Sequence, residues 1–395
     1  MTVLSACPCC GGAFETPFFE AGPAPVHSCL MLDSAAAALA FPTGRLRLAA
    51  CSDCGFVANL DFDPKWSAYS PDYEDQQSFS PTFNAFADQL ARDWIDRFGL
   101  EGKRAVEIGC SKGDFLALLA ERGGMETVGI DPSAIPGRVA PPSRGSIRLI
   151  QDYFGEEHLT LPADMICCRH TLEHIQPVGD VLRMMRRMAE ANDGAPLCIE
   201  VPDATRVWRE AAFEDVYYEH CSYFTPGSLA RALRAAGFGV VGLRREYGDQ
   251  YLVAEAVPNP GADESFDIEE DPAQTLDWIN AFSRRAPGVI AAWRARIDAA
   301  SEAGDRIAVW GSGSKCVAFL RAVDRIGAVS AIVDINPHRT GRFAPGLGVP
   351  ISGPDALKTA PPQLIIVMNP IYREEIQTSC RQTGVFARFI ALGDV

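Results

Sequence analysis

One short stretch in the middle of the chain gathers side chains that could move a proton. Tyr217, Glu219, His220 and Tyr223 lie close together in the sequence. A histidine titrates near neutral pH and can abstract a proton, a nearby carboxylate can orient its imidazole, and phenols can donate hydrogen bonds to a developing oxyanion. The alternative is a half-buried aromatic loop with one satisfied histidine. This density favours a catalytic site with His220 as the base.

A second histidine-bearing stretch, residues 170–175, follows a predicted strand at residues 164–168. Parallel sheets bind ligands at the carboxyl ends of their strands, so we place His170 among the cofactor-binding residues. The order His-x-x-Glu-His also occurs in inverted zincins, where it lies on a helix. Because it follows a strand here, a metalloprotease site is disfavoured.

A glycine-rich turn lies between a predicted strand at 104–109 and a predicted helix at 114–122. Small residues in such a turn let a ligand approach the backbone beside the helix N-terminus. Asp131 ends the next predicted strand, where a carboxylate can accept both hydroxyls of a ribose. A purely structural turn is the alternative. The pattern favours a nucleotide-type cofactor, with Glu107, Gly109, Cys110, Gly113 and Asp131 as its candidate contacts.

Two Cys-x-x-Cys-Gly turns, at Cys7–Cys10 and Cys51–Cys54, match the ligand spacing of a tetrahedral zinc site. Four thiolates fill the coordination shell, so the site is predicted to be structural. Buried or redox thiols are the alternative, and His27 and Cys29 are competing ligands. Cys9 has no predicted role.

A second glycine-rich turn, residues 311–315, follows a predicted strand at 307–310, and Asp334 ends the strand after it. The bare pattern suggests NAD. Cys316 stands where the dinucleotide fingerprint has its third glycine, so a NAD site is disfavoured.

Alternating strands and helices predict an α/β protein with parallel sheets. Before the first strand, apolar residues spaced by three and four predict a helix over 83–98 that ends at Gly99. Residues 258–272 are acidic and rich in turn formers, which indicates a linker. We expect a zinc-binding domain at 1–75, a cofactor-binding domain at 76–257 with a strand pair at 239–243 and 250–256, and a Rossmann-like domain at 273–395.

The composition is that of a globular protein, with 47% apolar and 22% charged residues among 395. A net charge of −15 disfavours nucleic acid and anionic membranes as partners. Thirteen cysteines without an export signal or a long apolar run indicate reduced thiols, so we expect a cytoplasmic protein. A small-molecule substrate and a monomer or homodimer are expected.

The pattern Glu107-x-Gly109-x-x-x-Gly113 with Asp131 resembles the first two motifs of class I S-adenosylmethionine (SAM)-dependent methyltransferases. That resemblance implies SAM as the cofactor and an adenine contact at Asp152. The whole ordered set of motifs resembles the C-methyltransferases of deoxysugar biosynthesis, which act on nucleotide-linked 4-keto sugars. The set comprises the cysteine turns, a tyrosine-rich segment at 69–74, the Leu-Glu-His-Ile and Tyr-x-Glu-His motifs, and a C-terminal Rossmann-like domain.

The resemblance to this family also implies residue roles. The histidine of Tyr-x-Glu-His, the family's proposed base, falls on His220, and the motif's tyrosine and carboxylate fall on Tyr217 and Glu219. The family's N-terminal active-site tyrosine falls on Tyr73, or less directly on Tyr69. The histidine after the fourth strand falls on His174, and the substrate-binding residues are expected to be Tyr223 and Lys315, with Lys315 at a phosphate.

Three departures from the family pattern concern the substrate more than the reaction. Ser111-Lys112 replaces an Asn-Asp pair, Cys316 ends the C-terminal loop, and residues 25–29 differ from the usual stretch.

The expected reaction is removal of a proton beside a ketone by His220, oriented by Glu219, with Tyr217 or Tyr73 donating a hydrogen bond to the enolate oxygen. The rival functions are O- or N-methyl transfer to a non-nucleotide metabolite and a non-catalytic binding module.

Overall fold

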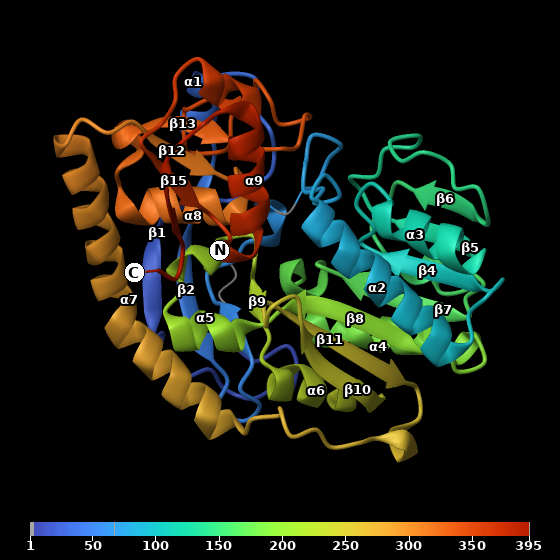
Figure 1. The fold of residues 1–395 in the computed structure, drawn as a ribbon. Coiled ribbons are helices and arrows are strands. Elements are labelled where there is room, and N and C mark those ends of the chain that lie inside the picture. Colours follow the sequence, from blue (N-terminus) through green and yellow to red (C-terminus); the bar gives the residue numbers. More distant parts are fainter. Residues whose placement is uncertain (1–3, 67, 395) are drawn as a thin grey trace.

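The computed structural model describes residues 4–66 and 68–394, whose strands form three sheets (Figure 1). The predicted α/β class is confirmed. Residues 1–3, which begin the stretch in which no export signal was expected, lie outside the described residues. Among the described residues, no helix combines the length and apolar character that crossing a membrane requires.

The central sheet has the order β10-β11-β8-β7-β4-β5-β6, and its strands from β4 to β8 run parallel. The predicted strand pair closes one edge as an antiparallel hairpin. The strands are β4 (Arg104–Ile108), β5 (Glu126–Ile130), β6 (Ser146–Ile150), β7 (Met165–Arg169), β8 (Leu197–Pro202), β10 (Gly239–Glu246) and β11 (Tyr251–Val257). β7 is buried along its whole length, which explains the apolar run from Met165 to Cys168.

Helix α2 (Pro81–Phe98) forms where the periodicity predicted a helix. The Ser80 hydroxyl caps its first turn by accepting a hydrogen bond from the amide of Phe83 at 3.2 Å. Gly99 ends it with a φ of 61°, in the left-handed region that favours glycine. Helix α1 (Ala35–Leu39) lies in the N-terminal segment. The other helices of the central domain are α3 (Asp114–Gly123), α4 (Val178–Ala191), α5 (Ala204–Glu210) and α6 (Pro226–Ala235).

The C-terminal sheet is parallel and has the order β14-β13-β12-β15-β16. The predicted linker precedes α7 (Pro272–Glu302), a long helix beside the N-terminal sheet in Figure 1. The remaining elements are β12 (Ile307–Trp310), α8 (Ser314–Val323), β13 (Val329–Val333), β14 (Ile351–Ser352), β15 (Leu364–Val367), α9 (Arg373–Thr383) and β16 (Arg388–Ala391).

The N-terminal sheet was not predicted from the sequence, which looked irregular before residue 80. It consists of β1 (Phe19–Pro25), β2 (Thr43–Ala50), β3 (Val57–Asn59) and β9 (Ser222–Tyr223), all antiparallel. Its fourth strand, β9, comes from within the predicted central domain, far along the chain from the other three. A partner so distant leaves no local pattern, and it joins the cysteine-bearing segment directly to the His220 segment.

One apolar core runs through all three predicted domains. Leu48 of β2, Trp208 of α5, Phe282 of α7 and Phe319 of α8 belong to the same buried cluster. The N-terminal segment therefore packs as part of the whole molecule. Short 3₁₀ helices complete the connections at Pro64–Trp66, Glu156–His158, Leu172–His174, Phe213–Asp215, Pro260–Ala262, Ile326–Ala328, Pro354–Lys358 and Pro370–Tyr372.

Candidate active site

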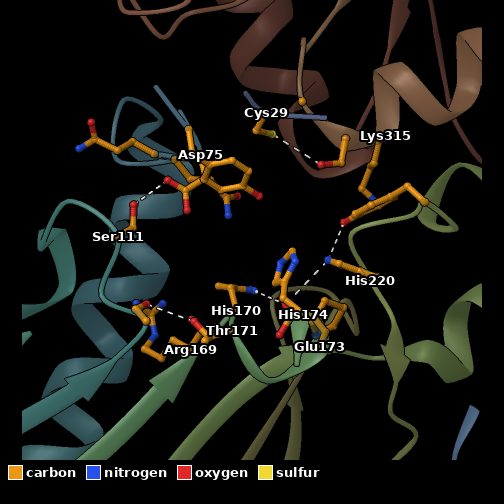
Figure 2. A pocket seen from close by; sticks show the side chains of 18 of the residues that line it. Cys29, Asp75, Ser111, Arg169, His170, Thr171, Glu173, His174, His220 and Lys315 are labelled. Atoms are coloured by element: carbon orange, nitrogen blue, oxygen red, sulfur yellow. Dashed lines mark hydrogen bonds and ion pairs between the residues drawn. The ribbon is translucent and has the colours of Figure 1, made fainter. Parts of the chain in front are cut away.

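A cavity of about 840 Å³ lies where residues that follow the strands of the central sheet meet residues that follow β12, β13 and β15 of the C-terminal sheet. Figure 2 shows this space between the central and the C-terminal parts of the chain. The predicted site residues that line it are Tyr69, Tyr73, Glu107, Gly109, Cys110, Asp131, His170, His174, Tyr217, His220, Tyr223 and Lys315. The glycine-rich turn and the Tyr-x-Glu-His segment therefore face one shared cavity.

The first glycine-rich turn has the close approach that its composition suggested. Gly109 has a φ of 74°, and a Cβ there would lie 1.9 Å from the Thr171 hydroxyl oxygen, so no larger residue fits. The Asp131 carboxylate accepts hydrogen bonds from the amides of Ser111 and Ser133 at 2.8 and 2.7 Å. Each carboxylate oxygen keeps a further acceptor position, so these bonds orient Asp131 and leave it able to accept two hydroxyls.

Two predicted cofactor contacts lie outside the cavity lining. Gly113 precedes α3 as its N-cap with a φ of 91°, and its amide donates to the carbonyl of Cys110 at 2.9 Å. Asp152 is exposed and accepts a hydrogen bond from the amide of Tyr153 at 2.8 Å. Because its side chain turns back on its own backbone, the neighbours Tyr153 and Phe154 line the cavity instead.

A cluster of charged side chains lies at the ends of β7 and β8, beside the first glycine-rich turn. His170 and Arg169 both pair with the buried Glu200, at 2.8 and 2.6 Å. Burial would lower the pKa of His170, but the carboxylates of Glu200 and Glu173 raise it to about 9. Burial raises the pKa of Glu107 to about 8, against the opposing charge of Arg169. His170 therefore presents a positive charge to the cavity at neutral pH.

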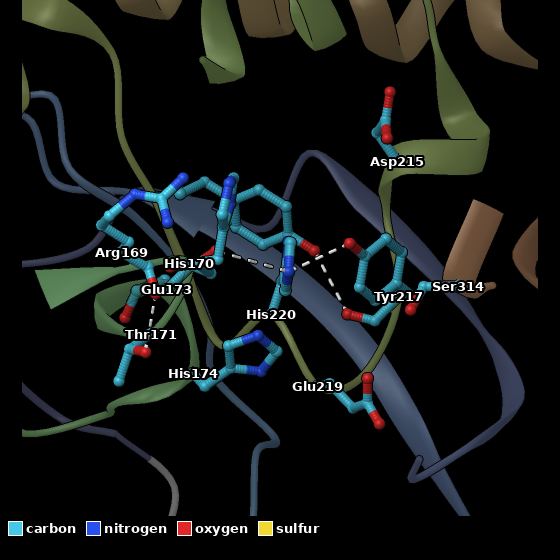
Figure 3. A network of polar contacts seen from close by, with 12 residues as sticks. Arg169, His170, Thr171, Glu173, His174, Asp215, Tyr217, Glu219, His220 and Ser314 are labelled. Atoms are coloured by element: carbon cyan, nitrogen blue, oxygen red, sulfur yellow. Dashed lines mark hydrogen bonds and ion pairs between the residues drawn. The ribbon is translucent and has the colours of Figure 1, made fainter. Parts of the chain in front are cut away.

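His220 is 6% exposed and contacts aromatic and polar side chains from two loops (Figure 3). The Tyr217 hydroxyl lies 3.0 Å from Nε2 of His220. The rings of His174 and His220 pack edge to face, with their centroids 4.8 Å apart. The Tyr69 hydroxyl in turn lies 2.9 Å from Nδ1 of His174. Burial lowers the pKa of His220 well below its usual value, and the charges of nearby histidines add to this effect. His220 is therefore a neutral imidazole that can accept a proton.

The expected role of Glu219 at His220 is corrected by the structure. The Glu219 carboxylate binds Nδ1 of His27 at 2.9 Å, the amide of Ser28 at 2.8 Å and the Tyr73 hydroxyl at 3.3 Å. Glu219 lies in a tight turn, closed by a hydrogen bond from the amide of His220 to the carbonyl of Tyr217 at 3.2 Å, and its side chain points away from that of His220. Tyr217 holds the imidazole instead, and Glu219 holds Tyr73.

Glu173, His174 and His220 also place potential ligand atoms within 4.8 Å of one another, as a metal site would. Nδ1 of His174 and Nε2 of His220 are already engaged by Tyr69 and Tyr217. A metal bound through these two nitrogens would have to displace both phenol contacts.

Lys315 lines the cavity, but its ammonium group pairs with Asp215. Arg206 pairs with the same carboxylate. Asp215 therefore partly neutralises both Lys315 and Arg206. A phosphate bound here would contact this three-residue ion-pair group and not the unpaired lysine that the sequence suggested. Tyr223 lines the cavity while its hydroxyl donates to the carbonyl of Tyr217 at 3.3 Å.

In the second glycine-rich turn, Ser312 donates its hydrogen bonds to Asp334, the aspartate that follows the next strand. Asp334 is 8% exposed and accepts hydrogen bonds from the amide and hydroxyl of Ser312 at 2.8 and 2.6 Å. It also accepts from the amide of Asn336 at 2.9 Å and pairs with Arg339 at 3.2 Å. With these partners Asp334 has little remaining capacity to accept the hydroxyls of a ribose.

Residues 69–80, here called the strap, run along the cavity between the central and the C-terminal sheets. Apart from Tyr69 and Tyr73, the sequence did not indicate a role for this segment. Lys112, fully buried, donates to the carbonyl of Tyr73 at 2.8 Å, and Arg339 donates to the carbonyl of Glu74 at 3.1 Å. Ser80 donates to Glu375 of α9 at 2.8 Å. Lys112 was visible only as a departure from the family pattern, and the contacts of Arg339 have no local signal.

The four predicted cysteine ligands gather apart from this cavity. The Sγ atoms of Cys7 and Cys54 are 3.6 Å apart, those of Cys10 and Cys51 are 3.5 Å apart, and all four lie within 4.8 Å of one another. A tetrahedral zinc with Zn–S bonds of about 2.3 Å requires sulfurs about 3.8 Å apart. The donor set therefore fits zinc. Cys9, which is 7% exposed, stands outside this group of four.

Two family models match the chain. A methyltransferase domain matches residues 83–243, and a C-methyltransferase C-terminal domain matches residues 256–391. The chain is 26% identical over 302 residues to the C-methyltransferase NovU of Streptomyces niveus, covering 71% of this chain and 70% of that protein. It is 30% identical over 134 residues to the ubiquinone biosynthesis O-methyltransferase of Pseudomonas aeruginosa, covering 32% of this chain and 56% of that protein.

Solved structures similar to the chain include two methyltransferases with bound S-adenosylhomocysteine. One is the 1,6-didemethyltoxoflavin N1-methyltransferase of Burkholderia thailandensis, at 20% identity and a TM-score of 0.33, covering 44% of this chain and 78% of that one. The other is the magnesium protoporphyrin IX methyltransferase of Synechocystis PCC 6803, at 16% identity and a TM-score of 0.34, covering 47% and 90%.

The match over residues 83–243 and the parallel sheet with its glycine-rich turn identify the central domain as a class I methyltransferase fold. The chain is a SAM-dependent methyltransferase.

Proposed function

We propose that this enzyme transfers the methyl group of SAM to a carbon beside the ketone of a nucleotide-linked keto-deoxysugar. The observation that carries the proposal is the neutral, buried His220 in the same cavity as the glycine-rich turn. Carbon acids need a positioned base, and a neutral imidazole supplies one. The match of residues 256–391 to a C-methyltransferase C-terminal domain and the likeness to NovU support carbon as the acceptor.

In this mechanism, the Gly109–Gly113 turn and Asp131 would hold the cofactor, and His170 would face its carboxylate. Bound SAM would supply an electrophilic methyl group, which the enolate carbon would take up as the S–CH3 bond breaks and S-adenosylhomocysteine leaves. His220 removes the proton from the substrate carbon while Tyr217 holds the imidazole at 3.0 Å. Tyr73, whose contact with Glu219 is long at 3.3 Å, turns its hydroxyl to the enolate oxygen. Arg206 and Lys315 are the candidate phosphate contacts.

We also propose that Cys7, Cys10, Cys51 and Cys54 hold a structural zinc ion. Four thiolates at the observed spacing complete a tetrahedral shell and leave no position for a substrate. The turn at Cys51–Cys54 joins β2 to β3, and β3 pairs with β9 beside His220. In this proposal the ion fixes the register of the sheet from which the catalytic loop extends.

The position of the transferred methyl group tests the proposed reaction. We would incubate the enzyme with SAM carrying a carbon-13 methyl group and with a panel of nucleotide-linked 4-keto-6-deoxyhexoses. Carbon-13 NMR is expected to place the label on a carbon adjacent to the ketone. A label on oxygen or nitrogen would contradict the proposal and favour the rival O- or N-methyl transfer.

The pH dependence of kcat/KM follows from the low pKa of His220. A base is inactive once protonated, so a lowered pKa moves the acidic limb of the profile below the usual histidine value of about 6.5. We expect the rate to stay on its plateau as pH falls through 6.5 and to decline only under more acidic conditions. An acidic limb centred at or above pH 6.5 would contradict the neutral, desolvated state assigned to His220.

A further inference from the structure

The strap places two acceptor groups beside the glycine-rich turn. The Ser111 hydroxyl donates to Oδ1 of Asp75 at 2.6 Å (Figure 2). Nε2 of Gln76 donates to Oδ2 of Asp114 at 2.8 Å. Asp75 and Gln76 both line the cavity, as do Ser111 and Asp114. The strap and the turn therefore form one continuous wall of the cofactor region.

The amide of Gln76 has a fixed orientation with an unsatisfied end. Its bond to Asp114 requires the amide nitrogen, since a carboxylate can only accept, and this sets the position of the amide oxygen. That oxygen is buried and has no hydrogen-bond partner among the residues that the structure describes. A buried acceptor left open in a cavity wall indicates a ligand that donates a hydrogen bond.

Asp75 carries a negative charge that the protein compensates only in part. Its burial raises the pKa, the nearby Lys112 opposes that effect, and Asp131 adds to it. The hydrogen bonds of the Lys112 ammonium group go to the carbonyls of Tyr73 and Ser133, at 2.8 and 2.7 Å. Glu107, 2% exposed, adds a carboxyl oxygen without a partner in the described part of the chain. Because burial raises the pKa of Glu107 to about 8, the negative charge of this wall comes from Asp75, and a cation beside Asp75 would compensate it.

SAM offers two cationic groups, the sulfonium and the ammonium of its amino-acid portion. A sulfonium has no hydrogen to donate, whereas an ammonium has three. Paired oxygen acceptors on a negatively charged wall therefore suit the ammonium. We propose that Asp75 and Gln76 of the strap bind the ammonium group of the cofactor, an assignment that rests on the proposed cofactor site at the Gly109–Gly113 turn.

Calorimetric titration with two ligands tests this assignment. S-adenosylhomocysteine carries the ammonium, and its deamino analogue, in which hydrogen replaces the amino group, does not. The Asp75→Asn variant is expected to lose about 10–100-fold in affinity for S-adenosylhomocysteine and less than about twofold for the analogue. Gln76→Leu, which removes the second acceptor, is expected to show the same selectivity with a smaller loss.

Asp72→Asn is the matched control, because Asp72 belongs to the same strap but is exposed and lies outside the cavity lining. It should bind both ligands as the wild type does. Equal losses of both ligands in Asp75→Asn, or no loss of either, would overturn the assignment while leaving the proposed function intact. If the wild type bound neither ligand, the cofactor site itself would be wrong and the assignment would fail with it.

Discussion

Replacing His220 with asparagine is expected to lower kcat about 10²–10⁴-fold, the usual contribution of a positioned general base. Asparagine keeps a polar group of similar size next to Tyr217 but cannot take up a proton. The affinity for S-adenosylhomocysteine should stay within about twofold of the wild type, because His220 lies across the cavity from the glycine-rich turn. Single-turnover rates and calorimetric titration measure the two quantities separately.

His158→Asn provides the matched control for this variant. His158 is also buried, at 5% exposure, but its ring accepts a hydrogen bond from the amide of Gly155 outside the cavity lining. Its replacement removes a buried imidazole without removing the proposed base, so the rate per folded enzyme should persist. A His220→Asn enzyme that kept a rate near that of the wild type would show that another group removes the proton.

Replacing Cys51 with serine is expected to lower the free energy of unfolding by more than about 4 kcal/mol, a loss typical of breaking a metal site. Cys51 directly follows β2, and the β2–β3 turn sets the pairing of β3 with β9. Losing one thiolate therefore disturbs the sheet that carries the loop at His220. Urea unfolding followed by circular dichroism measures the loss, and metal analysis of purified protein should find one zinc per chain in the wild type.

Cys9→Ser is the control for the cysteine cluster, because Cys9 is buried near it but stands outside the group of four. Its effect should be far smaller, and the variant should retain zinc. Equal stability of the Cys51→Ser and Cys9→Ser variants, together with a wild type that carries no metal, would refute the structural zinc ion.

The parts of the fold with local patterns were predictable from the sequence. The helix ending at Gly99, the strand before Gly109 and the edge hairpin each depend on residues close together in the chain, and all three form as expected. The N-terminal sheet was missed, because β3 pairs with β9, a strand that lies far along the chain within the predicted central domain.

The same distinction separates the predicted from the missed site residues. Tyr217 and His220 lie three residues apart and meet in the structure, at 3.0 Å. His27 meets Glu219 across 192 positions of sequence, so no spacing could have revealed that pair, and the sequence assigned Glu219 to the wrong histidine. The strap contacts of Lys112 and Arg339 have the same origin, since each joins segments from different sheets.

Proton exchange at the substrate carbon tests the central claim most directly, because it isolates the base from methyl transfer. A nucleotide-linked 4-keto-6-deoxyhexose that the enzyme methylates would be incubated in deuterium oxide with enzyme and S-adenosylhomocysteine, which has no methyl group to give. The account predicts that the wild type exchanges one proton beside the ketone for deuterium and that His220→Asn does not. Methyl transfer by an enzyme that catalyses no such exchange, or equal exchange by both enzymes, would contradict it.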